Sequence, residues 1–370
     1  MLLKKIKKFV HSPGVFFRDF FNKKYPRIYN EILCPKEEET ILIKYDLEFE
    51  KNININFPID VVFTWVNDND PEWKLKLNKY KDIDRHNHGQ YASDNARFNN
   101  HDELYFSIKS VRKNISWVRN IYIVTDSQIP EWLCEFNNVI IVDHRDIISE
   151  DFLPTFNSHV IEAHLHRING LSEHFIYFND DVFVARPLLP GHFFKNKKIT
   201  SLFISKKSLS KMKSRGVITP TLCASFNAKK ILRNKFCYDI DIPLVHTYVP
   251  LRKSMFEMVW NTYNKEINAF LGNKFRTNDD LNLATFLVPW FTYCSGYSIF
   301  TRDICYYFNI RSPVAKTYYL ALTKYSSKDA PHSFCANDFT ETKKSIINYQ
   351  LPLIAKLKTY FMDDEKTNVD

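Results

Sequence analysis

The chain has 370 residues, 45% of them hydrophobic, so it can bury one large core or two of medium size. Only seven residues are glycine, and neither a P-loop nor a GxGxxG fingerprint is present, which argues against the common phosphate-loop and dinucleotide-binding folds. The formal net charge is +9, but bases and acids are interspersed beyond the N-terminus, so we expect no nucleic-acid partner; a basic surface would also suit a polyanionic substrate or product.

Residues 1–56 are charged and irregular, and we interpret them as an N-terminal extension. In residues 1–24, lysines alternate with apolar residues, a pattern typical of a helix that lies on an anionic membrane surface. The alternative is a solvated basic helix or a partner-binding arm. No apolar run approaches the roughly 18 residues of a spanning helix. The seven cysteines form no CxxC pair and no secretory signal is visible, so we expect reduced, mostly buried thiols in a cytosolic protein.

An α/β domain is predicted over residues 57–345. Apolar runs rich in β-branched and aromatic residues predict four strands, at 59–66, 121–124, 139–142 and 175–178. Helical spacing predicts helices at 102–114, 159–168 and 254–271. This alternation indicates a Rossmann-like, mostly parallel sheet flanked by helices. We divide the domain into residues 57–200 and a more helical half, 201–345, and expect a C-terminal helix and tail at 346–370.

Aspartates end or follow the predicted strands; they are Asp68, Asp126, Asp143, Asp180 and Asp181. Ligands of such sheets bind beyond the carboxyl ends of the strands. Two adjacent carboxylates at the end of a buried strand are costly unless a cation lies between them, and a divalent metal that holds a phosphate fits this requirement. The alternative is a turn, because Asn-Asp is common in turns.

Two other sequence patterns resemble binding sites, but we predict no ligand for either. His159, His164 and His166 have near-helical spacing, but no cysteine ligand or HExxH motif lies nearby, and His164 and His166 point to different helix faces, so we predict no zinc site. The basic run KKSLSKMKSR at 206–215 is interpreted as a mobile loop.

Four segments follow one another in the order of a known family. They are IDVVFTWVNDNDPEW at 59–73, the stretch from RFNNHDELYF at 97–106 through FNDDV at 178–182 to about residue 192, the stretch from VHTYVPLRK to FRTNDDLN at 245–282, and HSFCANDF at 332–339. Together they resemble the Stealth family, which includes bacterial capsular polysaccharide phosphotransferases and the catalytic subunit of the animal N-acetylglucosamine-1-phosphotransferase. Two positions depart from the pattern: Asn100 stands where relatives often have Asp, and CAND replaces the more usual CLND.

The resemblance implies a metal-dependent enzyme with a fold similar to that of glycosyltransferases of the A type. It would transfer a hexose or hexosamine 1-phosphate from a UDP-sugar, UDP-GlcNAc or UDP-ManNAc, to a growing capsule polysaccharide and release UMP. A bacterial capsule polymerase, peripheral at the cytoplasmic face of the inner membrane, fits a short chain poor in paired cysteines. Two alternatives remain: a conventional glycosyltransferase that releases UDP, and a non-catalytic carbohydrate- or polyanion-binding protein.

Phosphoryl transfer requires neutralised phosphate charge, a proton acceptor and reactants held in line. From the family motifs we expect Asp180 and Asp181 to bind the metal, with Asn337 or Asp338 as a further ligand. Oxygen ligands favour Mg²⁺ or Mn²⁺.

Four further residues of the motifs are assigned to phosphate contact or to proton transfer. Arg97 and Arg276 are expected to contact phosphate, the alternative being ordinary surface ion pairs. His246 and Asp280 are the candidates for the proton acceptor, and a structural role is the alternative for His246.

The donor side is expected to consist of residues that follow the first strand. Trp65, Asn67 and Asp68 are assigned to donor binding, with core packing as the alternative for Trp65. Three more residues complete the expected substrate-binding set; they are Glu103, Asn179 and Lys253.

Overall fold

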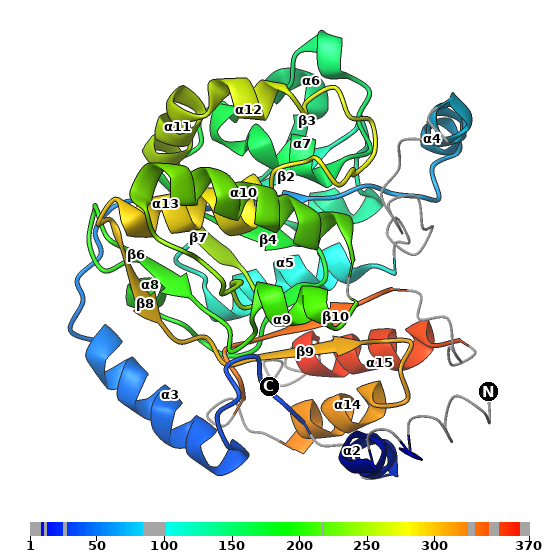
Figure 1. The fold of residues 1–370 in the computed structure, drawn as a ribbon, viewed down its shortest axis with the longest axis vertical. Helices are drawn as coiled ribbons and strands as arrows, with labels where there is room; N and C mark the ends of the chain where they lie inside the picture. Colours follow the sequence, from blue (N-terminus) through cyan, green and yellow to red (C-terminus); the bar gives the residue numbers. More distant parts are fainter. Residues whose placement is uncertain are drawn as a thin grey trace, which may run out of the picture.

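The computed structural model describes residues 9–10, 13–24, 28–83, 101–216, 218–324, 330–339 and 348–362. At its centre is a five-stranded sheet in the order β3-β2-β1-β4-β7 (Figure 1). The strands are β1 (Ile59–Thr64), β2 (Ile121–Thr125), β3 (Val139–Asp143), β4 (His174–Asn179) and β7 (Val249–Arg252). Strands β1 to β4 are parallel, and β7 is antiparallel to β4. The predicted α/β class with a mostly parallel, Rossmann-like sheet is confirmed.

The strand register aligns the carboxyl ends of the parallel strands. Thr64, the last residue of β1, pairs with Val124 on one side and with Asn179 on the other. On the next strand pair, Thr125 lies opposite Asp143. Residues that directly follow β2 and β4 therefore meet at one edge of the sheet, as expected for this fold class.

A second sheet begins where the first one ends. It has the order β5-β10-β9, from β5 (Val182–Val184), β10 (Ser333–Asn337) and β9 (Cys305–Asn309). Because β4 ends at Asn179 and β5 begins at Val182, Asp180 and Asp181 form the link between the two sheets. A third, two-stranded sheet joins β6 (Thr200–Phe203) to β8 (Ser298–Thr301).

Two hydrophobic clusters cover opposite faces of the main sheet, as the alternation along β1 shows. Val61 and Phe63 belong to the cluster shared with α5 (Glu103–Asn114), α14 (Ala315–Lys324) and α15 (Gln350–Phe361). Val62 belongs to the cluster shared with α7 (Ser158–Ala163), α10 (Pro220–Phe236), α11 (Lys253–Thr262) and α13 (Val288–Cys294). A strand buried on both faces explains why the predicted strands read as continuous apolar runs.

The other α-helices in the described ranges have between 4 and 15 residues. They are α2 (Pro13–Lys24), α3 (Lys36–Glu50), α4 (Pro71–Ile83), α6 (His144–Ile147), α8 (Pro190–Phe193), α9 (Leu209–Ser214) and α12 (Asn264–Asn268). The helix predicted at 254–271 is thus two helices, α11 and α12. None of the helices in the described ranges combines the length and hydrophobicity needed to cross a bilayer.

Part of the N-terminal extension packs against the domain. At the end of α3, Glu50 accepts a hydrogen bond of 2.9 Å from His192, whose other ring nitrogen lies 3.1 Å from Asp303. Near the middle of α3, Asp46 accepts a hydrogen bond of 2.9 Å from Arg302. Buried contacts therefore extend upstream of residue 57.

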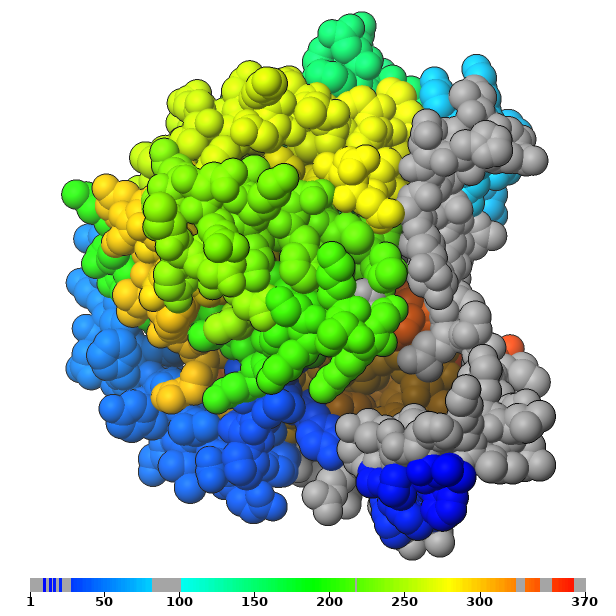
Figure 2. Space-filling view, in the orientation of Figure 1, coloured from blue at the N-terminus to red at the C-terminus, as the bar shows by residue number. Residues whose placement is uncertain are grey.

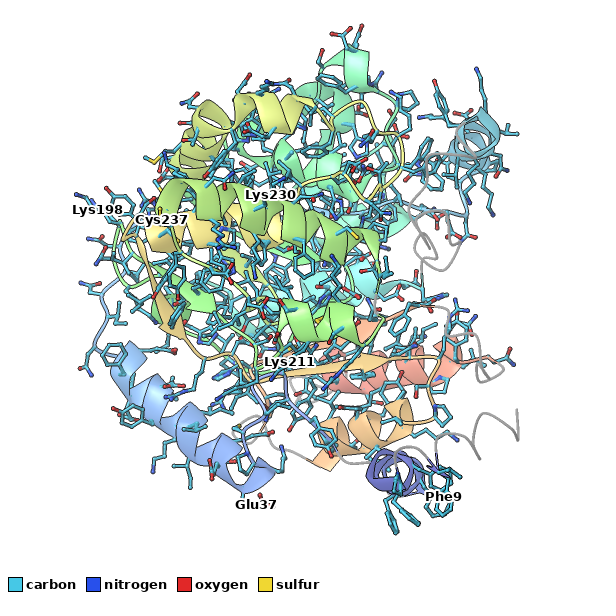
Figure 3. All side chains as sticks on the ribbon, viewed as in Figure 1. Phe9, Glu37, Lys198, Lys211, Lys230 and Cys237 are labelled. Carbon is cyan, nitrogen blue, oxygen red and sulfur yellow. The ribbon has the colours of Figure 1, made fainter. Side chains whose placement is uncertain are left out.

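The seven cysteines are free thiols, but they are not mostly buried as expected. Cys305 and Cys335 are buried, whereas Cys134 and Cys237 are exposed. Cys237, labelled in Figure 3, directly follows α10, where it adopts a left-handed backbone conformation.

Candidate functional site

Three carboxylates gather where the two larger sheets meet. Asp180 and Asp181 link β4 to β5, and Glu103 is the first residue of α5. Burial, reinforced by the neighbouring Asp181, raises the pKa of Asp180 to about 7. Burial and the negative charge of Asp180 also raise the pKa of Glu103 well above its ordinary value. Mutual repulsion of this kind marks a place that favours a cation.

The contacts of Asp181 leave one oxygen unsatisfied. Its Oδ2 accepts hydrogen bonds from Asn337 Nδ2 at 3.0 Å and from the Cys335 thiol at 3.3 Å. Its Oδ1 is buried and has no hydrogen-bond partner among the described residues. An unpartnered buried carboxylate oxygen costs free energy, so this site fits a divalent ion with oxygen ligands, Mg²⁺ or Mn²⁺. Asp180 and Asp181 are the residues placed to hold it.

A thiol beside Asp181 does not change this ligand preference. Asp181, His246 and Cys335 each place one ligand atom within 4.8 Å of the others. Burial, followed by the charge of Asp181, raises the pKa of the Cys335 thiol well above its ordinary value. A protonated thiol that donates to Asp181 positions this carboxylate but is not a metal ligand.

Asp338 is already held by other side chains. Its carboxylate pairs with the Arg311 guanidinium, with an Nη2–Oδ2 distance of 3.0 Å, and its Oδ2 also lies 3.2 Å from His101 Nε2 and 3.0 Å from the Tyr349 hydroxyl. Burial opposes ionisation of Asp338, but these hydrogen bonds lower its pKa. We therefore keep Asp180 and Asp181 as the expected ligands, and Asn337 as a residue that orients Asp181.

His246 lies beside the carboxylates with an exposed ring. The ring centroid is 4.9 Å from that of Tyr307, which belongs to β9. The backbone N–H of His246 donates to the carboxylate of Glu31, and the same carboxylate pairs with Lys207. A residue of the N-terminal segment thus fixes the backbone of the candidate proton acceptor.

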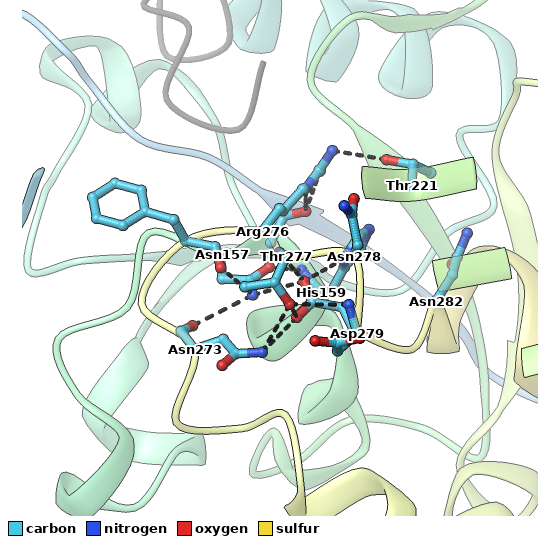
Figure 4. Close-up of polar contacts among 12 residues, drawn as sticks. Asn157, His159, Thr221, Asn273, Arg276, Thr277, Asn278, Asp279 and Asn282 are labelled. Atoms are coloured by element: carbon cyan, nitrogen blue, oxygen red, sulfur yellow. Dashed lines mark hydrogen bonds and ion pairs between the residues drawn. The ribbon is translucent and has the colours of Figure 1, made fainter. Parts of the chain in front are cut away.

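Asp280 lies in a different, closed network, and its partners His159, Asn157 and Asn273 are labelled in Figure 4. Its carboxylate accepts hydrogen bonds from His159 Nδ1 at 2.9 Å, Asn157 Nδ2 at 2.9 Å, Asn273 Nδ2 at 2.8 Å and the Thr277 hydroxyl at 2.8 Å. The side chain is fully buried, which opposes ionisation, but the hydrogen bonds from His159, Asn273 and Asn157 and the charge interaction with His159 together outweigh burial and lower the pKa of Asp280. This aspartate ties the start of α7 to the loop before Asn282.

Arg276 lies at the edge of the same network. Its Nε donates to the Ser158 hydroxyl at 2.9 Å, and Nη1 donates to Thr221 at 3.1 Å (Figure 4). Burial lowers the pKa of Arg276, and the Glu162 carboxylate opposes this shift. Among the described residues the guanidinium donates to the Ser158 and Thr221 hydroxyls and forms no ion pair, so its positive charge is available to an anionic ligand.

Asn179 and the loop after β1 lie at the same edge of the sheet. Asn179 Oδ1 accepts a hydrogen bond of 3.0 Å from the Tyr177 hydroxyl. Asn67 is fixed to Gln128 by two hydrogen bonds, from Asn67 N to Oε1 at 2.8 Å and from Nε2 to Asn67 O at 3.0 Å. Asp68 follows Asn67 directly. Trp65 is only 6% exposed and packs in the core, and no described residue accepts a hydrogen bond from its indole nitrogen.

A cavity of about 410 Å³ opens beside these loops, at the ends of β2 and β3. Asp126 and Ser127 line one side of it and α4 contributes Lys76, Lys79 and Tyr80. Lys76 pairs with Asp126 at 2.7 Å, which ties α4 to the end of β2. The cavity adds volume at this edge of the sheet.

One predicted site residue does not join this group. Lys253 lies at the opposite end of the sheet, because Arg252 pairs with His174, the first residue of β4, and Lys253 N donates to Glu173 O at 2.8 Å. Arg97 lies outside the described residues. We therefore leave Lys253 out of the proposed substrate site.

The structure adds residues that sequence reasoning missed. Cys335 and Tyr307 reach the site from β10 and β9, and Glu31 reaches it from the N-terminal segment. Cys335 could have been found, because it lies in the HSFCANDF segment. Nothing local in the sequence marks Glu31 or Tyr307.

The fold and site define a Rossmann-like α/β protein with an acidic site at the carboxyl edge of its sheet. Models of Stealth protein conserved regions match the chain: conserved region 1 at residues 57–85, region 2 at 97–202 and region 3 at 245–292. The chain is 55% identical to the capsular polysaccharide phosphotransferase LcbA of Aeromonas hydrophila, over 98% of this chain and 100% of that protein. It is 54% identical to a protein of the same name from Neisseria meningitidis, over 97% and 100%.

The chain therefore belongs to the Stealth family, as the sequence motifs indicated. Among solved structures, the galactosyltransferase LgtC is similar at 11% identity and a TM-score of 0.39, over 82% of this chain and 96% of that one.

Proposed function

We propose that this protein transfers a hexose 1-phosphate or hexosamine 1-phosphate from a UDP-sugar to a hydroxyl of a capsule polysaccharide and releases UMP. The relatives are named as capsular polysaccharide phosphotransferases and span the same length, which supports sugar-phosphate transfer in capsule synthesis. The observation that carries the proposal is the buried, unpartnered Oδ1 of Asp181, next to a second carboxylate and to His246.

The side chains of the site suit the three requirements of phosphoryl transfer. A divalent ion, when bound by Asp180 and Asp181, neutralises charge on the donor diphosphate. His246, exposed beside Asp181, takes the proton of the acceptor hydroxyl, whose oxygen forms a new bond to the β-phosphorus. The bond between this phosphorus and the oxygen bridging to the α-phosphate breaks, and UMP leaves with the bridging oxygen. Arg276, which is half-buried, offers a positive charge to a phosphate oxygen.

Donor binding is assigned to the loop after β1. The hydrogen bonds between Asn67 and Gln128 hold this loop against the end of β2. Asn67 and Asp68 are proposed to contact the nucleotide, and Trp65 to support the loop from the core. UDP-GlcNAc and UDP-ManNAc are the donors to test first.

A peripheral position at the inner face of the bacterial membrane is part of the proposal. Four phenylalanines at the N-terminus are 45–52% exposed; they are Phe9, Phe17, Phe20 and Phe21 (Figure 3 labels the first). Exposed aromatic side chains on a basic helix suit the boundary between lipid headgroups and acyl chains.

The test is to incubate the protein with Mg²⁺, a panel of UDP-sugars and a capsule oligosaccharide, and to follow the products by phosphorus NMR. A new phosphodiester signal together with UMP supports the proposal. UDP as the product would identify a conventional glycosyltransferase, and no donor turnover at all would favour a binding protein.

A further inference from the structure

The run at 206–215 is a strongly basic surface that the proposed reaction does not use. It contains five basic residues and no acidic one; they are Lys206, Lys207, Lys211, Lys213 and Arg215. All five are exposed. The run was expected to be a mobile loop, but residues 209–214 form α9, whose first turn is capped by the Ser208 hydroxyl bonded to Lys211 N at 3.1 Å.

An aspartate outside the run fixes this helix without neutralising it. Asp241 accepts hydrogen bonds of 2.6 Å from the hydroxyls of both Ser208 and Ser210, and it pairs with Lys229 of α10 at 3.0 Å. Within the described ranges, no carboxylate lies at ion-pair distance from Lys206, Lys211, Lys213 or Arg215. The positive charge of α9 is therefore held in place and open to an external anion.

The basic run begins at the candidate active site. The ammonium group of Lys207 lies 5.0 Å from the centroid of the Tyr307 ring, and this ring lies 4.9 Å from that of His246. Just before Lys207, Ser205 N donates to Pro243 O at 3.1 Å, so the two chain segments run together towards His246.

The figures place α9 on an open face. In Figure 2 the green surface of α9 and α10 stands beside a recess whose floor shows orange to red atoms, the colours of the segment from β9 to β10. Figure 3 labels Lys211 on α9 and Lys230 on α10, both on this face. The basic surface thus continues from the rim of the recess onto the neighbouring helix.

We propose that this run, the α9 tract, binds the phosphodiester groups of the growing polymer and holds its reacting end at His246. The inference rests on the proposed function, because that reaction adds one negative charge with each repeat unit. A polyanion with regularly spaced charges suits a row of exposed cations. Because several contacts act on one polymer chain, its overall affinity exceeds that of a single contact.

The test compares acceptors of different length in a variant with three charges removed. Lys211→Gln/Lys213→Gln/Arg215→Gln should raise the KM of an acceptor of about twenty repeats roughly tenfold. It should leave kcat and KM for a single-repeat acceptor unchanged and shorten the polymer products. The KM of the long acceptor should rise with salt in the wild type and much less in the variant.

The matched control removes three exposed charges elsewhere on the surface. Lys44, Lys198 and Lys265 are exposed and lie on α3, before β6 and on α12. The corresponding triple glutamine variant should retain the wild-type KM for the long acceptor. An equal KM increase in this control, an equal effect on long and short acceptors, or no effect in the α9 variant would each overturn the inference. Turnover of the short acceptor by the wild type tests the proposed function separately.

Discussion

His159 donates from Nδ1 to Oδ2 of Asp280 at 2.9 Å, so this aspartate holds a histidine other than His246. Asp280, the other candidate for the proton acceptor, shares no hydrogen bond with His246 among the described residues. The Asp280 carboxylate has both oxygens occupied by protein donors. His246, with its exposed ring near Asp181, is therefore the stronger candidate for the proton acceptor.

Metal dependence follows from the carboxylates at the end of β4. Asp181→Asn and Asp180→Asn should each lower turnover by roughly 10²-fold or more, because each removes a charge that would hold the cation. EDTA should have the same effect on the wild type, and Mg²⁺ or Mn²⁺ should restore activity. Circular dichroism should show an intact fold in both variants. Full turnover in EDTA after exhaustive dialysis would contradict the metal assignment.

His246 is expected to act on the acceptor rather than on the donor. His246→Ala should lower kcat by roughly 10²–10⁴-fold and change donor affinity much less. Steady-state kinetics with separate donor titration by calorimetry measures both quantities. A variant that turns over normally would remove His246 from the chemistry, and a variant that no longer binds UDP-sugar would place it in the donor site instead.

Asp280 is expected to stabilise the fold. Asp280→Ala leaves the donors of His159, Asn157 and Asn273 unpaired, so it should lower the free energy of unfolding by about 3–5 kcal/mol. The matched control is Asp279→Ala. Because Asp279 is exposed, this substitution should change the free energy of unfolding by about 0.5 kcal/mol or less. Urea unfolding measures both. Wild-type stability of Asp280→Ala with a large loss of kcat would indicate that Asp280 itself takes part in catalysis.

His192 makes stability depend on pH. Burial alone would lower the pKa of its imidazole, but Glu50 and Asp303 outweigh burial and raise it to about 9. The stabilisation is fully present below the ordinary value of 6.5, and it is lost as pH rises towards and through 9. Urea unfolding between pH 6.5 and roughly 9.5 should show this loss.

The same pH series, repeated with a His192 variant, shows whether His192 causes this loss of stability. His192→Gln should be less stable near neutral pH, because it leaves Glu50 and Asp303 facing each other without a cation. Its stability should also fall less steeply with rising pH. Parallel curves for the wild type and the variant would show that His192 is not charged in the folded protein.

The N-terminal helix is expected to bind membranes without affecting the chemistry. Deletion of residues 1–24 should weaken association with vesicles rich in anionic lipid and leave turnover of soluble acceptors unchanged, because the deletion stops short of Glu31. Vesicle co-sedimentation and a soluble assay measure the two effects. Unchanged sedimentation after deletion would contradict the membrane role.

Local patterns were sufficient for the main sheet but not for the contacts between distant segments. The four parallel strands are apolar on both faces, so their runs stand out in the sequence, and Asp180 and Asp181 were evident because they directly follow one of these runs. The contact between Glu31 and His246 joins residues 215 positions apart, and no local pattern encodes it. The helix at α9 was missed because its composition is that of a solvated loop, and a distant carboxylate, Asp241, fixes it.

The central claim is that phosphorus moves together with the sugar, and a donor labelled with ³²P in its β-phosphate tests it most directly. We predict that the label enters the polymer, one phosphorus for each sugar added, and that the nucleotide released is unlabelled UMP. Polymer that grows without label, while the label stays in UDP, would contradict the account.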